Sequence, residues 1–288
     1  MTGSDRSATR TGDPSRNGST DVQSLSLVNG QRTGVDPADR GLAYGDGLFE
    51  TMAAIDGRVR WLEQHLDRLE EGCRRLQIPP PPRQTLADEI AGQCPPAGRA
   101  IIKLILTRGS GARGYMPPAD ATPTRILSVG PWPDYPRSHY DVGIRIRTCR
   151  FRLAANPMLA GIKHLNRLEH VLAHLELRGT DAQQGLLLDT TGAVVGGTSS
   201  NIFAVHEGHL LTPAITRAGI RGVMRRVVLE TAAALGVDAA ERDVTREDIG
   251  RAQEVFVTNA VFGIWPVAAI DDRRLSRGPV TWRMMQHL

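Results

Sequence analysis

Lysine is scarce in this sequence, and one of its two lysines is a candidate for nucleophilic chemistry. The chain has 35 lysine and arginine residues, of which only Lys103 and Lys163 are lysines. An arginine side chain stays protonated and delocalised, so it cannot form a Schiff base with a carbonyl group, whereas a neutral lysine amine can. Because arginine supplies the positive charge elsewhere, we interpret Lys163 as an amine kept for covalent chemistry. An ordinary surface lysine at a helix start is an equally good interpretation of this position alone.

A helix that would position Lys163 is predicted within the stretch of residues 159–176. Leucines recur there at three- and four-residue steps, the period of one buried helix face, at Leu165, Leu168, Leu172 and Leu175. Lys163 would lie at or just before the first turn, where the helix dipole disfavours a cation by roughly 0.3–1 kcal/mol. The dipole is therefore expected to shift the amine toward its neutral, nucleophilic form.

Two other stretches are candidates for binding an anion. Residues 108–118, RGSGARGYMPP, form a flexible glycine-rich loop with Arg108 and Arg113, which suits an anion and equally suits an ordinary hairpin tip. The helix predicted over 218–229 starts with glycine, and its free N–H groups could hold a phosphate, although many helices begin this way. A lysine amine, a phosphate-binding helix start and a cationic loop together favour a carbonyl cofactor that carries a phosphate.

Hydrophobic patterning predicts an α/β protein with two domains. The 288 residues are 41% hydrophobic, enough for two domains of ordinary size or one large domain. We expect a disordered leader over 1–23, an N-terminal α/β domain over 24–129, a proline-broken linker over 130–138 and a C-terminal α/β domain over 139–288. Short apolar runs predict strands over 48–55, 100–107, 124–129, 143–148, 185–189, 202–205, 254–258 and 264–270.

Composition excludes several function classes. The net charge is +4 and the pI about 9.3, but the charges are interspersed and no basic block carries aromatic residues, so no nucleic-acid partner is predicted. No run of 18 apolar residues exists to span a membrane, and residues 1–23 lack the apolar core of a secretory signal. Cys73, Cys94 and Cys149 are odd in number and lack metal-ligand spacing, so we expect no metal site and a reduced, cytoplasmic location.

Eight stretches, in order along the chain, resemble the class IV, branched-chain-aminotransferase-like family of pyridoxal phosphate enzymes. They are DRGLAYGDGLFET, HLDRL, RGSGARGY, TRILSV, LAGIKHLNRLE, TSSNIF, AGIRGVMR and TNAVFGIWPV. LAGIKHLNRLE and GSGARGY favour the 4-amino-4-deoxychorismate lyase branch over the transaminase branches. The resemblance implies a two-domain fold-type IV enzyme with pyridoxal 5′-phosphate in the interdomain cleft. It also implies a homodimer, with part of each site near the partner chain, that converts 4-amino-4-deoxychorismate to 4-aminobenzoate and pyruvate for folate biosynthesis.

The resemblance also implies roles for individual residues. Lys163 would be the Schiff-base lysine and the proton shuttle. Arg68, which by itself would be interpreted as a solvated arginine of a helix over 61–76, would grip the cofactor phosphate. Arg113 would bind a substrate carboxylate, and Tyr115 would be a second substrate-binding residue. Backbone groups would complete the phosphate site at Gly222, Val223, Met224, Asn259 and Ala260.

One position departs from the family pattern. The family has a glutamate five residues before the residue that matches Asn201, where it pairs with the pyridine nitrogen of the cofactor, and this chain has Gly196. An anion at that place keeps the nitrogen protonated and makes the ring a strong electron sink. Its loss should weaken transamination more than an elimination that forms an aromatic ring. The alternatives are a class IV transaminase of D-amino, branched-chain or other amines, and a non-catalytic relative.

Overall fold

The first half of the chain folds around an antiparallel sheet. The computed structural model describes residues 25–288, so the predicted leader over 1–23 lies outside the described residues. The sheet has the strand order β1-β5-β4-β2-β3. The strands are β1 (Leu25–Val28), β2 (Gly47–Ile55), β3 (Arg58–Val59), β4 (Arg99–Thr107) and β5 (Thr124–Pro131), with helix α1 (Arg40–Tyr44) before β2.

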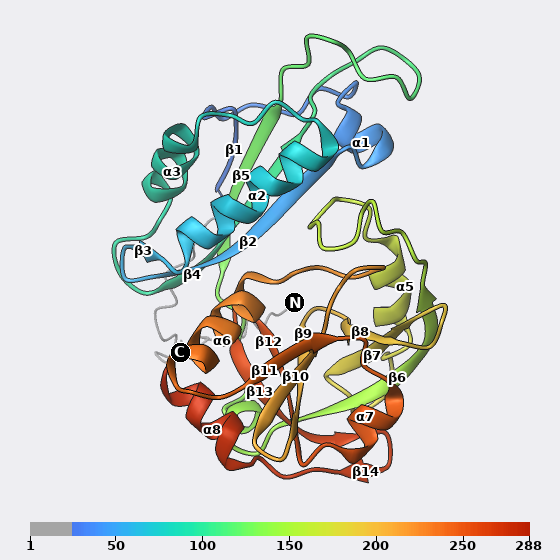
Figure 1. Cartoon of the computed structure of the whole chain (residues 1–288). Coiled ribbons are helices and arrows are strands. Elements are labelled where there is room, and N and C mark those ends of the chain that lie inside the picture. The colour runs from blue at the N-terminus through green and yellow to red at the C-terminus, as the bar shows by residue number, and fades with distance from the viewer. Residues whose placement is uncertain (1–24) are drawn as a thin grey trace, which may run out of the picture.

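Alternating burial along β2 and β4 explains how this sheet is covered. Leu48 and Met52 of β2 are buried, and they belong to the same apolar core as Leu66 of α2 (Leu62–Leu76) and Ile90 of α3 (Arg83–Gly92). Phe49 and Thr51, on the opposite face of β2, are partly exposed, because alternate residues of a strand point to opposite sides. The two helices thus leave one face of the sheet open toward the second half of the molecule (Figure 1).

The second half folds around a larger mixed sheet. Its strand order is β11-β10-β9-β12-β13-β6-β7-β8, with β14 paired to β13. The strands are β6 (Ile144–Leu153), β7 (Gln184–Asp189), β8 (Val194–Gly197), β9 (Asn201–His206), β10 (His209–Pro213), β11 (Ala239–Arg242), β12 (Glu254–Asn259), β13 (Gly263–Ile270) and β14 (Arg273–Arg274). The helices are α4 (Ser138–Asp141), α5 (Leu168–Leu175), α6 (Val223–Ala234), α7 (Arg246–Arg251) and α8 (Pro279–Gln286).

The two sheets are separate along the chain as well as in space. No strand continues from one sheet into the other, because β5 ends at Pro131 and β6 begins at Ile144. The boundaries predicted at 130 and 138 fall within or beside this connection and remain a prediction. Among residues 25–288 no helix is long and apolar enough to cross a membrane.

The prediction of a buried leucine face around Lys163 is wrong. The helix is only α5, and its Leu168, Leu172 and Leu175 are 69%, 42% and 41% exposed. The segment before α5 is instead drawn into backbone pairing with the start of β2, where Phe49 N donates to Lys163 O (3.0 Å) and Leu165 N to Gly47 O (3.0 Å). This long-range pairing replaces the first turns of the expected helix.

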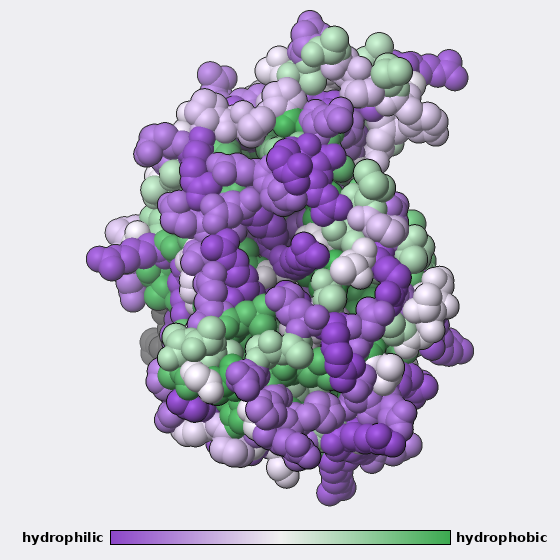
Figure 2. Space-filling model, in the orientation of Figure 1, coloured by the Kyte–Doolittle hydropathy of each residue, from purple (hydrophilic) through white to green (hydrophobic). Residues whose placement is uncertain are grey.

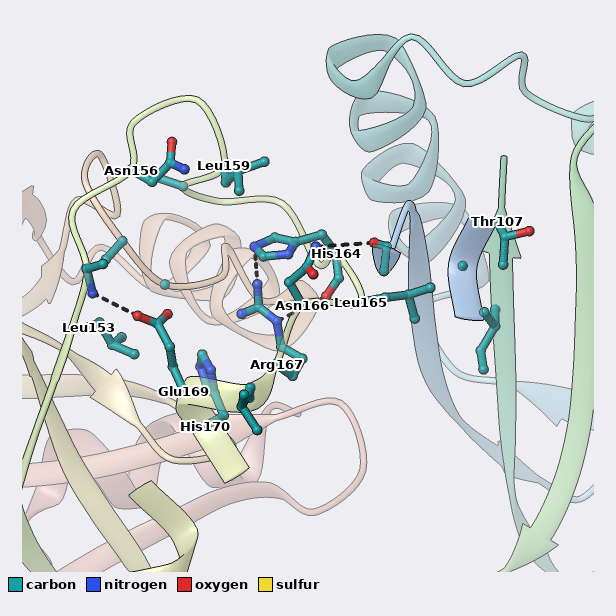
Figure 3. A pocket seen from close by; sticks show the side chains of 18 of the residues that line it. Thr107, Leu153, Asn156, Leu159, His164, Leu165, Asn166, Arg167, Glu169 and His170 are labelled. Atoms are coloured by element: carbon teal, nitrogen blue, oxygen red, sulfur yellow. Dashed lines mark hydrogen bonds between the residues drawn. The ribbon is translucent and has the colours of Figure 1, made fainter. Parts of the chain in front are cut away.

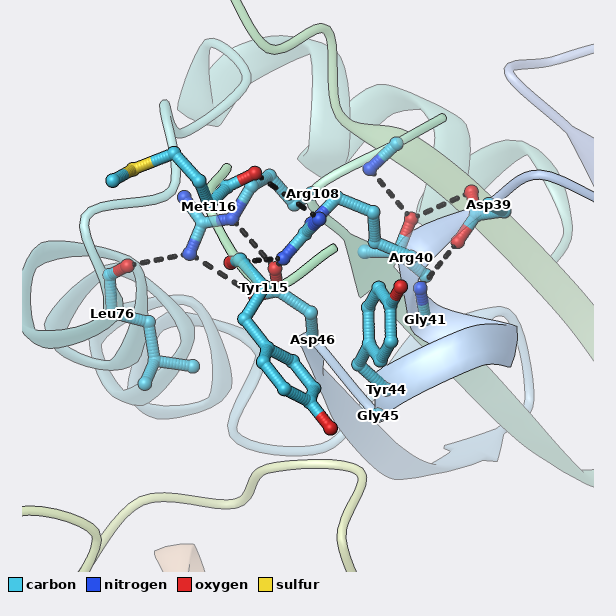
Figure 4. A network of polar contacts seen from close by, with 12 residues as sticks. Asp39, Arg40, Gly41, Tyr44, Gly45, Asp46, Leu76, Arg108, Tyr115 and Met116 are labelled. Carbon is cyan, nitrogen blue, oxygen red and sulfur yellow. Dashed lines mark hydrogen bonds and ion pairs between the residues drawn. The ribbon is translucent and has the colours of Figure 1, made fainter. Parts of the chain in front are cut away.

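A partly buried carboxylate, that of Asp46, ties the glycine-rich loop to the rest of the first sheet (Figure 4). It accepts from Arg40 Nε (2.9 Å) and from Arg108 Nε (2.8 Å) and Nη2 (3.0 Å). Burial alone would raise the pKa of Asp46, but the hydrogen bonds and charges of the two arginines outweigh it and lower that pKa. Arg108 is therefore occupied, and the prediction that it offers charge to an anion from a flexible loop is wrong.

Both arginines extend the network to backbone carbonyls. Arg40 donates to Gly114 O (2.9 Å) and Tyr115 O (2.9 Å) in the loop after β4. The guanidinium of Arg108 donates to the carbonyl of Leu76, the last residue of α2, and to that of Gln77, which follows it. The network therefore fixes the loop relative to the helix that carries Arg68.

Asp46→Ala should destabilise the protein by about 3–5 kcal/mol, because two buried guanidinium groups would lose their counterion. Urea unfolding followed by circular dichroism measures the change. Glu71→Ala is the matched control, since it removes an exposed ion pair with Arg74 and should change stability by less than about 1 kcal/mol. Equal losses of stability in the two variants would show that the ion pairs of Asp46 stabilise the protein no more than an exposed ion pair does.

Candidate active site

Lys163 lies in a cavity of about 420 Å³ that is lined by residues from both sheets. Phe49 and Thr51 of β2 contribute from the first half, and Ser199 and Val261 are among those from the second. All residues predicted to bind the cofactor line this cavity, namely Arg68, Lys163, Gly222, Val223, Met224, Asn259 and Ala260. The fold thus brings together residues that are nearly 200 positions apart, while their individual roles remain predictions.

The surroundings of Lys163 favour its neutral amine. Its Nζ lies 4.2 Å from the centroid of the Phe49 ring. Burial lowers the pKa of Lys163 to about 7, helped by the charge of Arg68 and opposed by that of Glu50. A pKa of about 7 makes a large share of the amine neutral near neutral pH. The helix-dipole explanation is wrong, because α5 begins only at Leu168.

Glu50 holds Arg68 in place from behind the cavity. Its carboxylate accepts from Arg68 Nε (2.8 Å) and also from Nη2, and it shares a 2.6 Å hydrogen bond with His65 Nδ1. Burial alone would raise the pKa of Glu50, but Arg68 and His65 lower it to about 2. Sequence analysis missed Glu50 and His65, although the three-residue spacing of His65 and Arg68 already placed them on one helix face.

The start of α6 presents uncapped N–H groups to the cavity. No side chain caps this twelve-residue helix, and its first residues, Val223 and Met224, line the cavity. Gly222 is required here, because a Cβ would come 2.1 Å from Asn201 Oδ1, which accepts from Gly222 N. The helix begins five residues later than predicted, but its start has the free donors and dipole that suit a phosphate.

Uncharged hydroxyl groups form another part of the wall. Thr198, Ser199 and Ser200 each direct a hydroxyl to Gln184 Oε1, at 3.1–3.2 Å. Among all residues lining the cavity there is no aspartate or glutamate.

Neither Asp189 nor Glu50 replaces the missing glutamate at Gly196. Asp189 is paired with Arg217 (3.0 Å), and Glu50 is bound behind Arg68. Gly196 itself does not have a positive φ, so backbone conformation does not demand glycine there. A Cβ would nevertheless come 2.8 Å from Ser200 O, so any larger residue requires a small shift of this strand.

Arg113 and Tyr115 do not join the cavity within one chain. Both are exposed, Tyr115 by 86%, on the loop that projects from the first sheet between β4 and β5 (Figure 1). The Tyr115 ring packs edge-on against Tyr44 with centroids 5.4 Å apart. Neither side chain is among the residues that line the Lys163 cavity.

Comparisons with known proteins decide the family. The family model described as amino-transferase class IV matches residues 47–270. The chain belongs to the class IV aminotransferase family. An aminodeoxychorismate lyase from Vibrio harveyi is 35% identical over 244 residues, which cover 84% of this chain and 90% of that protein. A putative branched-chain-amino-acid aminotransferase from Methanocaldococcus jannaschii is 35% identical over 246 residues, 84% of each protein.

A solved structure supports the same assignment. The crystal structure of 4-amino-4-deoxychorismate lyase from Pseudomonas aeruginosa is 48% identical, with a TM-score of 0.88, over 92% of this chain and 98% of that chain. The predicted resemblance and the fold-type IV architecture are thus confirmed. Class IV enzymes use pyridoxal phosphate, and the residues present fit it: uncapped amides and Arg68 match a phosphate, and neutral Lys163 matches an aldehyde.

Borohydride reduction of the class IV enzyme with pyridoxal phosphate should place the reduced adduct on Lys163. When the protein is first freed of cofactor and then mixed with pyridoxal phosphate, the yield of reduced adduct should rise with pH around a midpoint of about 7, because the amine loses its proton there. Peptide mass spectrometry after reduction at a series of pH values measures both site and midpoint. An adduct on Lys103, or a midpoint near the roughly 10.4 of an ordinary lysine, would contradict this assignment.

Proposed function

We propose that the protein is a pyridoxal phosphate-dependent lyase that converts 4-amino-4-deoxychorismate to 4-aminobenzoate and pyruvate. The observation that carries the proposal is a lysine amine with a pKa of about 7 in a cavity without a lining carboxylate. Such a cavity suits proton transfer near neutral pH and an anionic ligand, and it offers little support for the pyridine protonation that transamination needs. The similarity to the Pseudomonas lyase favours the same reaction.

Lys163 is the residue that moves the proton in the proposed reaction. Bound pyridoxal phosphate supplies an aldehyde that captures the substrate amine and a ring that withdraws electrons. Neutral Lys163 Nζ removes the proton from the ring carbon that carries the amine. The electrons of that C–H bond form a ring double bond while the C–O bond on the adjacent carbon breaks. The enolpyruvyl group leaves, takes up a proton as pyruvate, and the ring becomes aromatic 4-aminobenzoate.

The phosphate-binding end of the cavity is proposed to fix the position of the cofactor for this reaction. Arg68 is oriented by Glu50, and the first N–H groups of α6 point to the same region. Together they would anchor a phosphate, so that the aldehyde end lies toward Lys163. Asn259 and Ala260 are proposed to complete this site from the end of β12.

We further propose a homodimer, in which the exposed Arg113 and Tyr115 of one subunit serve the cavity of the other. Exposed apolar side chains gather along α5, at the right of the molecule in Figure 2, including Leu168, Val171 and Leu172. Exposed apolar side chains gathered on one helix are typical of a protein interface. The three cysteines that the structure describes are free thiols, which supports the proposed cytoplasmic location.

Arg113→Ala should raise KM about ten- to a hundredfold, because a charge-assisted hydrogen bond to a substrate carboxylate would be lost. Cofactor content, measured by absorbance, should not change. Mixing this variant with Lys163→Ala subunits should restore part of the activity if Arg113 acts across the interface. An unchanged KM would remove Arg113 from the substrate site.

Gly196→Glu should raise transaminase half-reactions with amino acids more than it raises 4-aminobenzoate formation, because a carboxylate would help to keep the pyridine nitrogen protonated. Gly196→Ala is the matched control, since it introduces the same Cβ, 2.8 Å from Ser200 O, without the charge. Circular dichroism and cofactor content establish that both variants are folded and loaded. If the two activities rise equally in the glutamate variant, the argument about the electron sink is wrong.

The decisive experiment for the proposed function is a product assay. The protein is incubated with 4-amino-4-deoxychorismate, and pyruvate and 4-aminobenzoate are quantified together. Equal amounts of both, without an added amino acceptor, are expected. An aminated cofactor that forms from amino acids, with no pyruvate from 4-amino-4-deoxychorismate, would instead favour the transaminase that the Methanocaldococcus relative suggests.

A further inference from the structure

Arg167 is a guanidinium without a carboxylate partner at the junction of two cavities. It lines the Lys163 cavity and also a second cavity of about 690 Å³, together with Leu153, His170 and Gly219 (Figure 3). Its Nε donates to His164 O (3.0 Å), and its Nη2 contacts the His164 ring. Within residues 25–288 it forms no ion pair.

The two other arginines that line these cavities have their charge compensated. Arg68 is bound to Glu50, and Arg217 of the second cavity is bound to both Asp189 (3.0 Å) and Asp243 (2.9 Å). A charge removed from water is costly unless it is paired, so an arginine left without a partner inside a cavity indicates an anionic ligand.

The neighbours of Arg167 do not supply that anion. Glu169 directs Oε1 to Ala154 N (2.9 Å), as Figure 3 shows. The two nearby histidines are neutral, because burial and the charge of Arg167 lower the pKa of His164 to about 4 and that of His170 to about 3. Both rings also have a buried Nδ1 without a hydrogen-bond partner, so the polar groups around Arg167 are incompletely satisfied.

We propose that Arg167 binds a carboxylate of the substrate at the passage between the two cavities. This inference rests on the proposed function, whose substrate carries two carboxylates. The phosphate of the cofactor has its own donors at Arg68 and the start of α6, so it does not need Arg167. A planar guanidinium matches a carboxylate with two parallel hydrogen bonds. Arg167 lines the same cavity as Lys163, the proposed catalytic residue.

Binding of a matched ligand pair to the cofactor-loaded protein tests this site. The acid 4-aminobenzoate and the uncharged 4-aminobenzamide are titrated by calorimetry against the wild type, Arg167→Gln, Arg167→Lys and the control Arg178→Gln. Arg178 is exposed and follows α5. The wild type and the control should prefer the acid. Arg167→Gln should weaken the acid about ten- to a hundredfold and leave the amide and cofactor affinity unchanged, and Arg167→Lys should show an intermediate loss.

Three results would overturn the proposal: a wild type that does not prefer the acid, an Arg167→Gln protein that keeps the preference, or a loss of cofactor affinity with the preference intact. The last result would assign Arg167 to the cofactor instead. Circular dichroism shows which variants are folded. If Arg167→Gln is not folded, the acid preference of Arg167→Lys decides the test. The product assay tests the lyase activity separately. If the wild type forms no pyruvate but its preference for the acid still depends on Arg167, the lyase is refuted and the carboxylate site is retained.

Discussion

The buried contact of Glu50 with Arg68 and His65 is the interaction on which the cavity depends. It joins β2 to α2 and fixes a guanidinium at the cavity wall, while the carboxylate itself is 2% exposed. A carboxylate bound in this way lowers the cost of burying Arg68 but is not available to a ligand. The cavity is consequently lined by arginines, a lysine, hydroxyls and backbone N–H groups, and not by any acid.

This distribution of charge connects the lysine to the reaction. Burial and the charge of Arg68 bring the pKa of Lys163 to about 7, so the same amine can accept and return a proton near neutral pH. The positive wall attracts a ligand with a phosphate and carboxylates. In the proposed function, Gly196 would leave the cofactor ring without a carboxylate to stabilise its protonated nitrogen, and a reaction driven by formation of an aromatic ring would tolerate that loss best.

Local patterns predicted the strands and the family well, whereas contacts between distant segments were not predictable. Alternation of apolar residues and turn residues around 48–55 or 100–107 reflects local geometry, and the structure has β2 and β4 there. The helix around Lys163 was misplaced because the segment pairs with residues 47 and 49 of the other sheet. The sequence also suggests that Arg108 is available to an anion, because no local pattern shows its partner Asp46, which lies 62 positions away. Patterns within one chain also gave no sign that Arg113 lies outside the cavity.

The protonation state of the cofactor ring tests the central claim of a cavity without an acid most directly. The protein is loaded with pyridoxal phosphate labelled with ¹⁵N in the ring, and the ¹⁵N chemical shift is measured by NMR from acidic to alkaline pH. The account predicts the shift of an unprotonated pyridine nitrogen at neutral pH. The shift of a protonated pyridinium at neutral pH would contradict it, because it would require a carboxylate that the lining of the Lys163 cavity does not contain.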